Sequence, residues 1–255
     1  MLEDRQWRSQ LDRDGFVLLP GVFRARQVEL MLCELTAGLQ GPHGDAATMR
    51  SAAGNVYGAR NLLELWPGSA VVWRQPPLPA ALATTLGADY GLVRVLYFDK
   101  PPDRSWALPW HKDLTIAVRE HRGATGAFSK PTRKAGIPHV EAPLHVLQGM
   151  LTVRIHLDDV TEENGPLKVV PGSHLAGKEL RLDQAPPHAV LAKRGDVLLM
   201  RPLVAHSSGD TCPRTRQHRR VVHLEFAAQS ALADGYAWHD FLPGNIAATD
   251  ASIRG

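Results

Sequence analysis

The segment Leu151–Leu157, Leu-Thr-Val-Arg-Ile-His-Leu, alternates apolar and polar side chains at every position. Successive side chains of a β-strand point to opposite faces of a sheet, so this alternation predicts a strand with one face in an apolar core. The opposite face would carry Thr152, Arg154 and His156. A period of two in the middle of the chain therefore points to a fold built on sheets.

Further short apolar runs, bounded by turn residues, follow from about residue 91 onward. We expect strands over residues 92–99, 167–170, 196–200 and 220–227. Between two of them, Asn164-Gly165 is a strong hairpin signal because both residue types accept a positive φ angle. Several short strands of this kind are typical of a barrel or sandwich of the jelly-roll type. We therefore expect a mainly β fold with flanking helices on one outer face.

The first ninety residues hold the expected helices. A strand is predicted within residues 11–21, where a turn glycine precedes Phe-Val-Leu-Leu and Pro-Gly ends the run. A helix over roughly residues 25–39 and a second helical region over 68–86, broken by prolines near 76–79, follow it. We expect one domain over residues 1–255, with strand and helices in 11–90, a jelly-roll core in 91–227 and a tail in 228–255.

Composition sets wider limits. The chain has 255 residues, 44% hydrophobic and 22% charged, which suits a soluble globular protein with a sizeable core. No run approaches the ~18 apolar residues of a membrane span, and the mixed charges of residues 1–10 argue against a secretory signal. Cys33 and Cys212 lack the spacing of disulfides or metal ligands, so we expect free thiols in a cytoplasmic protein. The net charge of +3 neither favours nor excludes nucleic acid.

A candidate metal site lies in the segment Leu108-Pro-Trp-His-Lys-Asp-Leu114. His111 and Asp113 place an imidazole and a carboxylate side by side, and His206 is the candidate for a third ligand. Two histidines and one carboxylate form the facial triad of non-haem Fe(II) oxygenases, which leaves three coordination positions open. The pair alone is weak support, and the motifs that follow it strengthen the assignment.

Residues 115–148 do not fit the strand pattern, since they combine glycines, prolines and charges with little periodicity. A long segment without regular structure inside a compact domain is usually functional. Because this one begins just after Asp113, we interpret it as a lid over the metal site. A disordered insertion is the alternative.

Five motifs in order resemble the phytanoyl-CoA dioxygenase family of Fe(II)/2-oxoglutarate oxygenases. They are His111/Asp113, Asn164-Gly165, Pro171-Gly-Ser-His174, Gly195-Asp196, and His206 followed by Arg219. The opening Gly-Phe-Val-Leu-Leu-Pro-Gly is similar as well, so the resemblance spans roughly residues 11–227. It implies a double-stranded β-helix that uses Fe(II), 2-oxoglutarate as cosubstrate and O₂. The implied reaction couples oxidative decarboxylation of 2-oxoglutarate to hydroxylation of a substrate, or to a related C–H oxidation.

The resemblance also implies roles for individual residues. His111, Asp113 and His206 would be the catalytic metal ligands, and Arg219 would hold the distal carboxylate of 2-oxoglutarate, as a planar guanidinium can. Ser208 and Thr152 match positions of hydroxyl groups that contact the cosubstrate. Arg216 and Arg220 stay open as alternatives to Arg219, although Arg220 should point to the opposite face of its strand.

Substrate contacts are less defined. Arg94 and Arg154 should face the metal, so each needs an anionic partner, which could be substrate, 2-oxoglutarate or a neighbouring acid. Basic residues after the two ligand segments would favour an anionic ligand if they border one pocket: Lys130, Arg133, Lys134, Arg214, Arg216, Arg219 and Arg220. We expect a small to medium-sized metabolite, possibly anionic. His174 is interpreted as structural, and His156 and His223 as core or supporting residues.

Other functions stay open. A metal-dependent cupin enzyme of another reaction class would keep the ligands but would not need Arg219. A non-catalytic metal-binding or sensor protein would tolerate their loss. Asp113 favours hydroxylation over halogenation, because related halogenases replace this carboxylate with a small residue. We expect no nucleic-acid partner, since the chain lacks a basic groove interleaved with aromatic residues, and no membrane.

Overall fold

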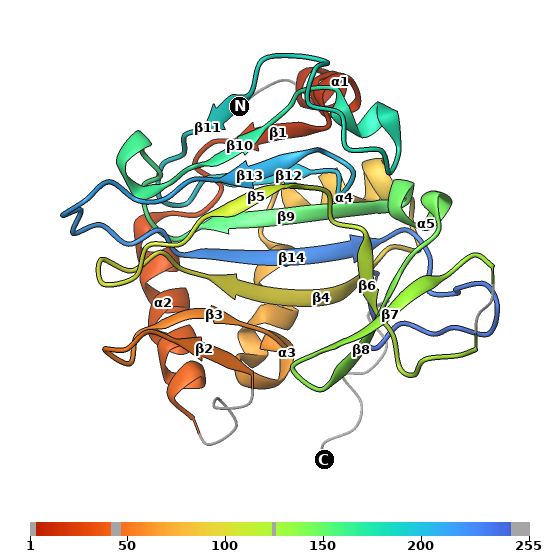
Figure 1. The fold of residues 1–255 in the computed structure, drawn as a ribbon, viewed down its shortest axis with the longest axis horizontal. Coiled ribbons are helices and arrows are strands. Elements are labelled where there is room, and N and C mark those ends of the chain that lie inside the picture. Colours follow the sequence, from red (N-terminus) through yellow and green to blue (C-terminus); the bar gives the residue numbers. More distant parts are fainter. Residues whose placement is uncertain (1–3, 42–46, 124–125, 246–255) are drawn as a thin grey trace.

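The computed structural model describes residues 4–41, 47–123 and 126–245. Two antiparallel sheets face each other and enclose the inner space of a jelly roll (Figure 1). The large sheet has the order β1 (Phe16–Leu19), β12 (Val197–Met200), β9 (Met150–His156), β14 (Val221–Ala227), β4 (Gly91–Phe98), β3 (Val56–Ala59) and β2 (Thr48–Arg50). The smaller sheet has the order β11 (His188–Val190), β10 (Leu167–Val169), β13 (His206–Ser208) and β5 (Leu108–His111).

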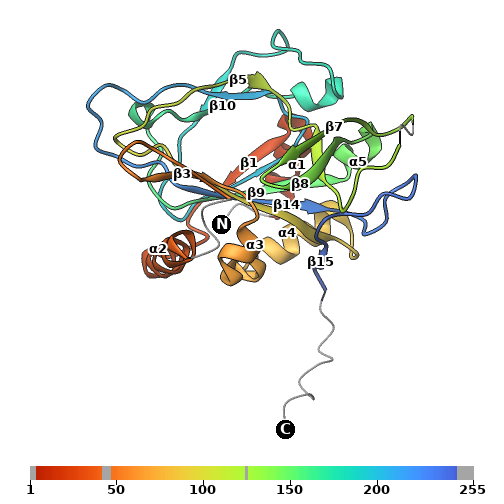
Figure 2. The same cartoon turned by 60° about the horizontal axis from the view of Figure 1, so that its bottom comes forward.

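The helices cover the outer face of the large sheet, as expected (Figure 2). These helices are α2 (Ala25–Gln40), the short α3 (Leu62–Leu65) and α4 (Leu78–Leu86). α1 (Asp4–Asp14) packs beside β1. None of the helices in the described ranges is both long and apolar enough to cross a membrane.

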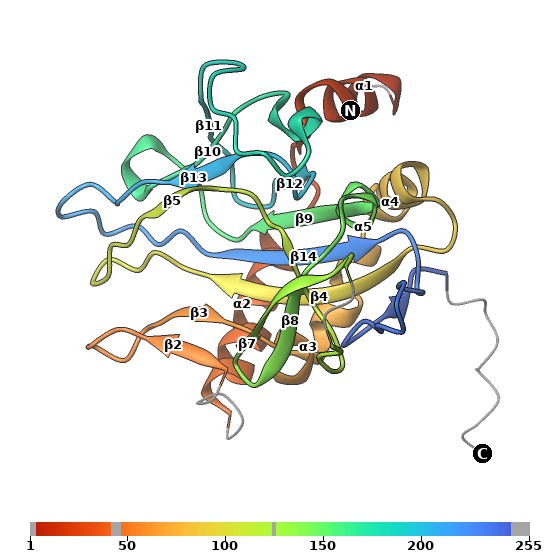
Figure 3. The ribbon, with the colours of Figure 1, turned by 45° about the vertical axis from the view of Figure 1, so that its right-hand side comes forward.

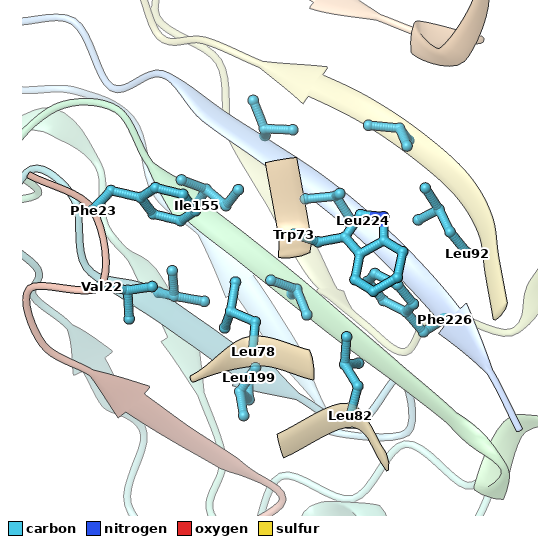
Figure 4. Packing of buried hydrophobic residues seen from close by; sticks show 14 of the residues in the cluster. Val22, Phe23, Trp73, Leu78, Leu82, Leu92, Ile155, Leu199, Leu224 and Phe226 are labelled. Carbon is cyan, nitrogen blue, oxygen red and sulfur yellow. The ribbon is translucent and has the colours of Figure 1, made fainter. Parts of the chain in front are cut away.

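The alternation of Leu151–Leu157 is confirmed by β9. Its residues Leu151, Val153 and Ile155 are fully buried in the main core, between the large sheet and the helices. Trp73 lies at the centre of this core and meets Phe226 edge-on, with ring centroids 5.3 Å apart (Figure 4). The other face of the strand, with Arg154, turns toward the smaller sheet.

Most of the predicted elements are confirmed. Each strand expected over 92–99, 167–170, 196–200 and 220–227 is present with its ends shifted by at most two residues. The helix over 25–39 is α2, and the region over 68–86 consists of two 3₁₀ turns, Pro67–Ala70 and Val72–Arg74, and then α4. Of the expected tail over 228–255, residues 228–245 return along the sheet, where β15 (Leu242–Pro243) pairs with β4, and the rest lie outside the described residues.

The strand predicted within residues 11–21 is confirmed as β1, while residues 11–14 end helix α1. One local prediction is wrong. Asn164-Gly165 does not close a hairpin, because β9 and β10 on either side of it belong to different sheets. The Asn164 side chain instead accepts from the Thr161 amide and donates to the Asp159 carbonyl, which stabilises a crossover turn.

The described part of 115–148 is folded and not the irregular or disordered segment that its composition suggested. It forms a third sheet, β6 (Thr115–Ala117), β8 (Ile137–Glu141) and β7 (Ser129–Lys134), followed by α5 (Leu144–Gln148). Most of β7 is exposed, so no buried face imposes an alternation on its sequence. Its role as a lid stays a prediction.

We expect Trp73→Ala to lower the free energy of unfolding by about 3–5 kcal/mol, because a large cavity would open among fully buried side chains. Chemical denaturation followed by circular dichroism measures this change. The matched control is Val71→Ala, at a neighbouring position that is 56% exposed, which should shift the same quantity by less than about 0.5 kcal/mol. Equal effects of the two variants would contradict the placement of Trp73.

Candidate active site

Strand pairing brings the predicted metal ligands together. His111 ends β5 and His206 begins β13, and the two are direct partners in the antiparallel register. The amide of Asp113 donates to the carbonyl of Pro202 at 3.0 Å, which fixes the carboxylate beside both imidazoles. His111 Nε2 lies 3.8 Å from Asp113 Oδ1, and His206 Nε2 lies 3.6 Å from Asp113 Oδ2. One ligand atom from each of the three residues fits within a 4.8 Å group.

The residue between the two first ligands points the other way. Lys112 is buried, and its Nζ donates to the carbonyls of Ser173 and Gly177 at 2.8 and 2.7 Å. The Pro-Gly-Ser-His turn therefore supports the ligand segment from outside the metal group. His174 of that turn lies against the N-terminal helix, with Nε2 3.2 Å from the Asp12 carbonyl, which agrees with the structural role predicted for it.

Hydrogen bonds orient both histidine ligands. Nδ1 of His111 lies 2.8 Å from the Pro109 carbonyl, and Nδ1 of His206 lies 2.9 Å from the Val204 carbonyl. A carbonyl can only accept, so Nδ1 carries the proton and Nε2 presents a lone pair to the centre of the group. Burial lowers the pKa of His206 to about 4, which keeps this imidazole neutral near pH 7.

The carboxylate ligand is ionised. Burial by itself would raise the pKa of Asp113, but the neighbouring basic groups, led by His206 and including Arg94, lower it to about 2. Neutral imidazoles and an ionised carboxylate are the forms that bind divalent cations. The donor set therefore fits Fe(II) at a site with open positions.

A cavity of about 420 Å³ opens in front of these ligands, between the two sheets. Its apolar wall includes Phe98, Trp106 and Leu167, and its polar wall carries arginines from strands of the large sheet and from the residues that flank them. The volume lies in the lower part of the ~300–1,000 Å³ range of small-molecule sites.

Arg219 is the arginine that faces the cavity at the start of β14. It is 3% exposed, and its guanidinium makes no hydrogen bond to any residue in the described ranges. Burial, together with nearby Arg154, lowers the pKa of Arg219 to about 9, so it still carries its charge at neutral pH. A buried cation without a partner is unfavourable, and an anionic ligand in the cavity would supply the missing charge.

The two alternatives to Arg219 point elsewhere. Arg220 donates from Nε and Nη2 to the carboxylate of Asp158 at 2.8 and 2.6 Å, and Arg216 is exposed. Neither lines the cavity.

Comparison with known proteins agrees with this geometry. The model of the phytanoyl-CoA dioxygenase (PhyH) family matches residues 11–221. The chain belongs to this family. The resemblance predicted from five motifs is thereby confirmed, and the family's match includes all three candidate ligands and Arg219.

One relative of this chain is named as a hydroxylase. L-proline trans-4-hydroxylase from Streptomyces griseoviridis is 31% identical over 104 residues, which are 41% of this chain. The chain matches about a third, 31%, of that enzyme's length.

Solved structures show the same fold. The non-haem alpha-ketoglutarate-dependent epimerase SnoN from nogalamycin biosynthesis has a TM-score of 0.65 at 22% identity, over 95% of this chain and 84% of SnoN. EctD from S. alaskensis, with 2-oxoglutarate and 5-hydroxyectoine, has a TM-score of 0.66 at 20% identity, over 89% and 76% of the two chains. The fold is thus a double-stranded β-helix, as expected.

The hydroxyl groups expected near the cosubstrate are placed differently from each other. Ser208 lines the cavity beside His206. Thr152 is buried on the inner face of β9, but its register partner on β14 is Glu225, far along the strand from Arg219. The structure therefore brings Ser208, and not Thr152, to the part of the cavity that holds Arg219.

The two arginines expected to face the metal have unequal partners. Arg94 donates through Nε and Nη2 to the carboxylate of Glu225, so a neighbouring acid supplies its counter-charge. Arg154 has no such acid: its Nη1 lies 3.0 Å from Nδ1 of His223, and its Nε has no partner among the described residues. Arg154 therefore adds a second uncompensated cation near Arg219.

Sequence reasoning missed two basic residues near the cavity. Lys100 is fully buried, with Nζ 5.0 Å from the ring of Trp106 and a hydrogen bond to the Gly209 carbonyl. Burial, with the added effect of Arg219, lowers its pKa to about 7. Arg60, directly after β3, lines the cavity itself. The local sequence pattern indicated neither, since Lys100 follows a predicted strand and Arg60 lies in a region for which no element was predicted.

We expect His111→Ala and Asp113→Ala each to abolish stoichiometric Fe(II) binding, because each removes one of three ligands. Anaerobic titration with Fe(II), followed by metal analysis of desalted protein, measures this. His145→Ala changes an exposed histidine outside the metal group and serves as the control. Unchanged iron affinity in both ligand variants would remove the triad assignment.

Proposed function

We propose that this protein is an Fe(II)/2-oxoglutarate-dependent oxygenase that hydroxylates a small to medium-sized metabolite. One observation carries the proposal: a single cavity contains both the His111/Asp113/His206 group and the buried, unpartnered Arg219. A metal site alone would suit many reactions. The added anion site suits a cosubstrate that chelates the metal and extends a second carboxylate away from it.

His111, Asp113 and His206 would hold Fe(II) and leave positions for the cosubstrate and O₂. The iron would supply the activation of O₂ that the oxidative decarboxylation of 2-oxoglutarate and the attack on a C–H bond require. The chain's own task is to keep the three donors deprotonated and oriented, through the carbonyls behind each imidazole. Asp113, as a carboxylate ligand, favours hydroxylation over halogenation.

Arg219 would bind the distal carboxylate of 2-oxoglutarate. Its guanidinium can donate two parallel hydrogen bonds, and its charge is preserved at neutral pH. Ser208 lines the same cavity and can donate from its hydroxyl. Arg154, with its unpartnered Nε, supports binding of an anion in the same region.

Cavity size supports a small substrate. About 420 Å³ must hold both the cosubstrate and the part of the substrate that reacts. An amino acid of the size of proline, the substrate in the name of the Streptomyces relative, is compatible with this space. The free and exposed thiols of Cys33 and Cys212 support a reducing cytoplasm as the location.

We expect anaerobic addition of Fe(II) and then 2-oxoglutarate to produce the weak visible band of a keto acid chelated to iron. Arg219→Ala should weaken binding of 2-oxoglutarate by about ten- to hundredfold, since a charge-assisted contact of ~1.5–3 kcal/mol is lost. Titration of the band measures this affinity.

The control is Arg216→Ala, which removes an exposed arginine from the same segment and should leave the titration unchanged. Bound iron without any band in the wild-type protein would instead favour a metal-dependent cupin of another reaction class.

A further inference from the structure

The cavity has a second end, remote from Arg219. Arg219, just before β14, and His223 and Glu225 of β14 all line it, and the six residue steps from Arg219 to Glu225 span roughly 20 Å of extended chain. Figures 1 and 3 show the sheet of β6, β7 and β8 lying across the end of β14 that carries Glu225. A ligand held at Arg219 therefore leaves the Glu225 end to another group.

Part of the charge at this end is already balanced. Arg94 is paired with Glu225, and its Nη1 lies 3.0 Å from Nε2 of His139. The guanidinium can only donate, so Nε2 of His139 accepts and Nδ1 carries the proton that faces the Ile137 carbonyl at 3.0 Å. Burial also lowers the pKa of His139 to about 4. This histidine is neutral, and the Arg94–Glu225 pair has no net charge.

Two further cations at this end make no direct ion pair with a described acid. Arg60 and Lys134 both line the cavity. The Arg60 guanidinium makes neither a hydrogen bond nor an ion pair within the part of the chain that the structure describes. Lys134 Nζ donates to the hydroxyl of Thr115 at 2.8 Å, which is a neutral partner. Burial and then the field of Arg94 lower the pKa of both groups, and this lowering outweighs the opposite effect of the nearby Glu225 carboxylate.

A hydrogen bond from a side chain to the backbone joins the segments that carry these two cations. Nδ2 of Asn61 donates to the carbonyl of Ala135 at 3.3 Å, which joins the segment of Arg60 to the β7–β8 turn. Ala135 and Gly136 both have positive φ angles, 48° and 80°, as a tight two-residue hairpin requires. Lys134, which precedes this turn, is therefore fixed against the segment that follows β3.

The other cations of the same hairpin are satisfied outside the cavity. Lys130 Nζ lies 2.7 Å from Oε2 of Glu141, and Arg133 donates to the Gly136 carbonyl at 3.0 Å. Of the three basic residues between 130 and 134, only Lys134 lines the cavity. The hairpin thus directs one of its three basic side chains into the cavity. On a basic surface that only contacts solvent, all three would point outward.

We infer that Arg60 and Lys134 bind an anionic group of the substrate, a carboxylate or a phosphate, at the end of the cavity opposite Arg219. The inference rests on the proposed function, because it takes Arg219 as the site of the cosubstrate. An anion between the two cations would hold the rest of the substrate toward the metal group, since both cations and all three candidate ligands line the same cavity.

The test starts from protein loaded anaerobically with Fe(II) and 2-oxoglutarate, whose visible band reports on the proposed function before a substrate is added. A panel of small carboxylic acids, amino acids and phosphate monoesters is then compared in air with the matching amides and alcohols, with succinate release as the readout. We expect anionic members, and not their uncharged counterparts, to stimulate succinate release. The class that stimulates succinate release more strongly, carboxylates or phosphates, identifies the anionic group of the substrate.

Variants connect this preference to the two residues. Arg60→Gln and Lys134→Gln should each raise the half-saturating concentration of the stimulating anion by about ten- to hundredfold. Lys130→Gln, in the same hairpin but outside the cavity, is the matched control and should leave it unchanged.

Equal stimulation by uncharged compounds overturns the inference, and so does a panel in which no anion acts on protein with an intact band. An unaltered half-saturating concentration in both Arg60→Gln and Lys134→Gln also overturns the inference. Absence of the band itself would count against the proposed function instead.

Discussion

β5 and β13 pair with His111 opposite His206, and the candidate metal site depends on that register. The two histidines come from distant parts of the chain, so only closure of the smaller sheet joins them. Asp113 is then placed by a single backbone hydrogen bond to Pro202, just past the end of β5. The large sheet supplies the facing wall, and its inward side chains become the groups that a bound molecule meets.

That wall carries more positive than negative charge. Arg94 projects from β4, Arg154 from β9 and Arg219 from the residues just before β14, and among them only Arg94 has a hydrogen-bonded carboxylate partner, Glu225. Buried charges without partners lower the stability of a folded protein. The arrangement is therefore understandable as preparation for anionic ligands, whose binding to the folded state alone would add to its stability.

Sequence patterns predicted what depends on a buried face or on a motif of fixed chemistry. β9 alternates because one side packs in the core, and the ligands with Arg219 were found through their motifs. The exposed strand β7 has no such face, so its residues looked irregular. The place of Arg60 in the cavity depends on contacts between distant segments, such as that of Asn61 with Ala135, and no local sequence pattern encodes such contacts.

The strands β6, β7 and β8 pair with one another and, among the described strands, with no strand of the jelly roll. The register of β4, β14 and β9 therefore does not depend on hydrogen bonds to this sheet, which contacts them through apolar side chains such as Ile116 and Val140. The candidate metal ligands and Arg219 belong to the barrel, while the β7–β8 hairpin supplies one wall of the cavity through Lys134. Exchange of this one hairpin would therefore change which molecules the cavity accepts and leave intact the strand pairing that joins His111 to His206.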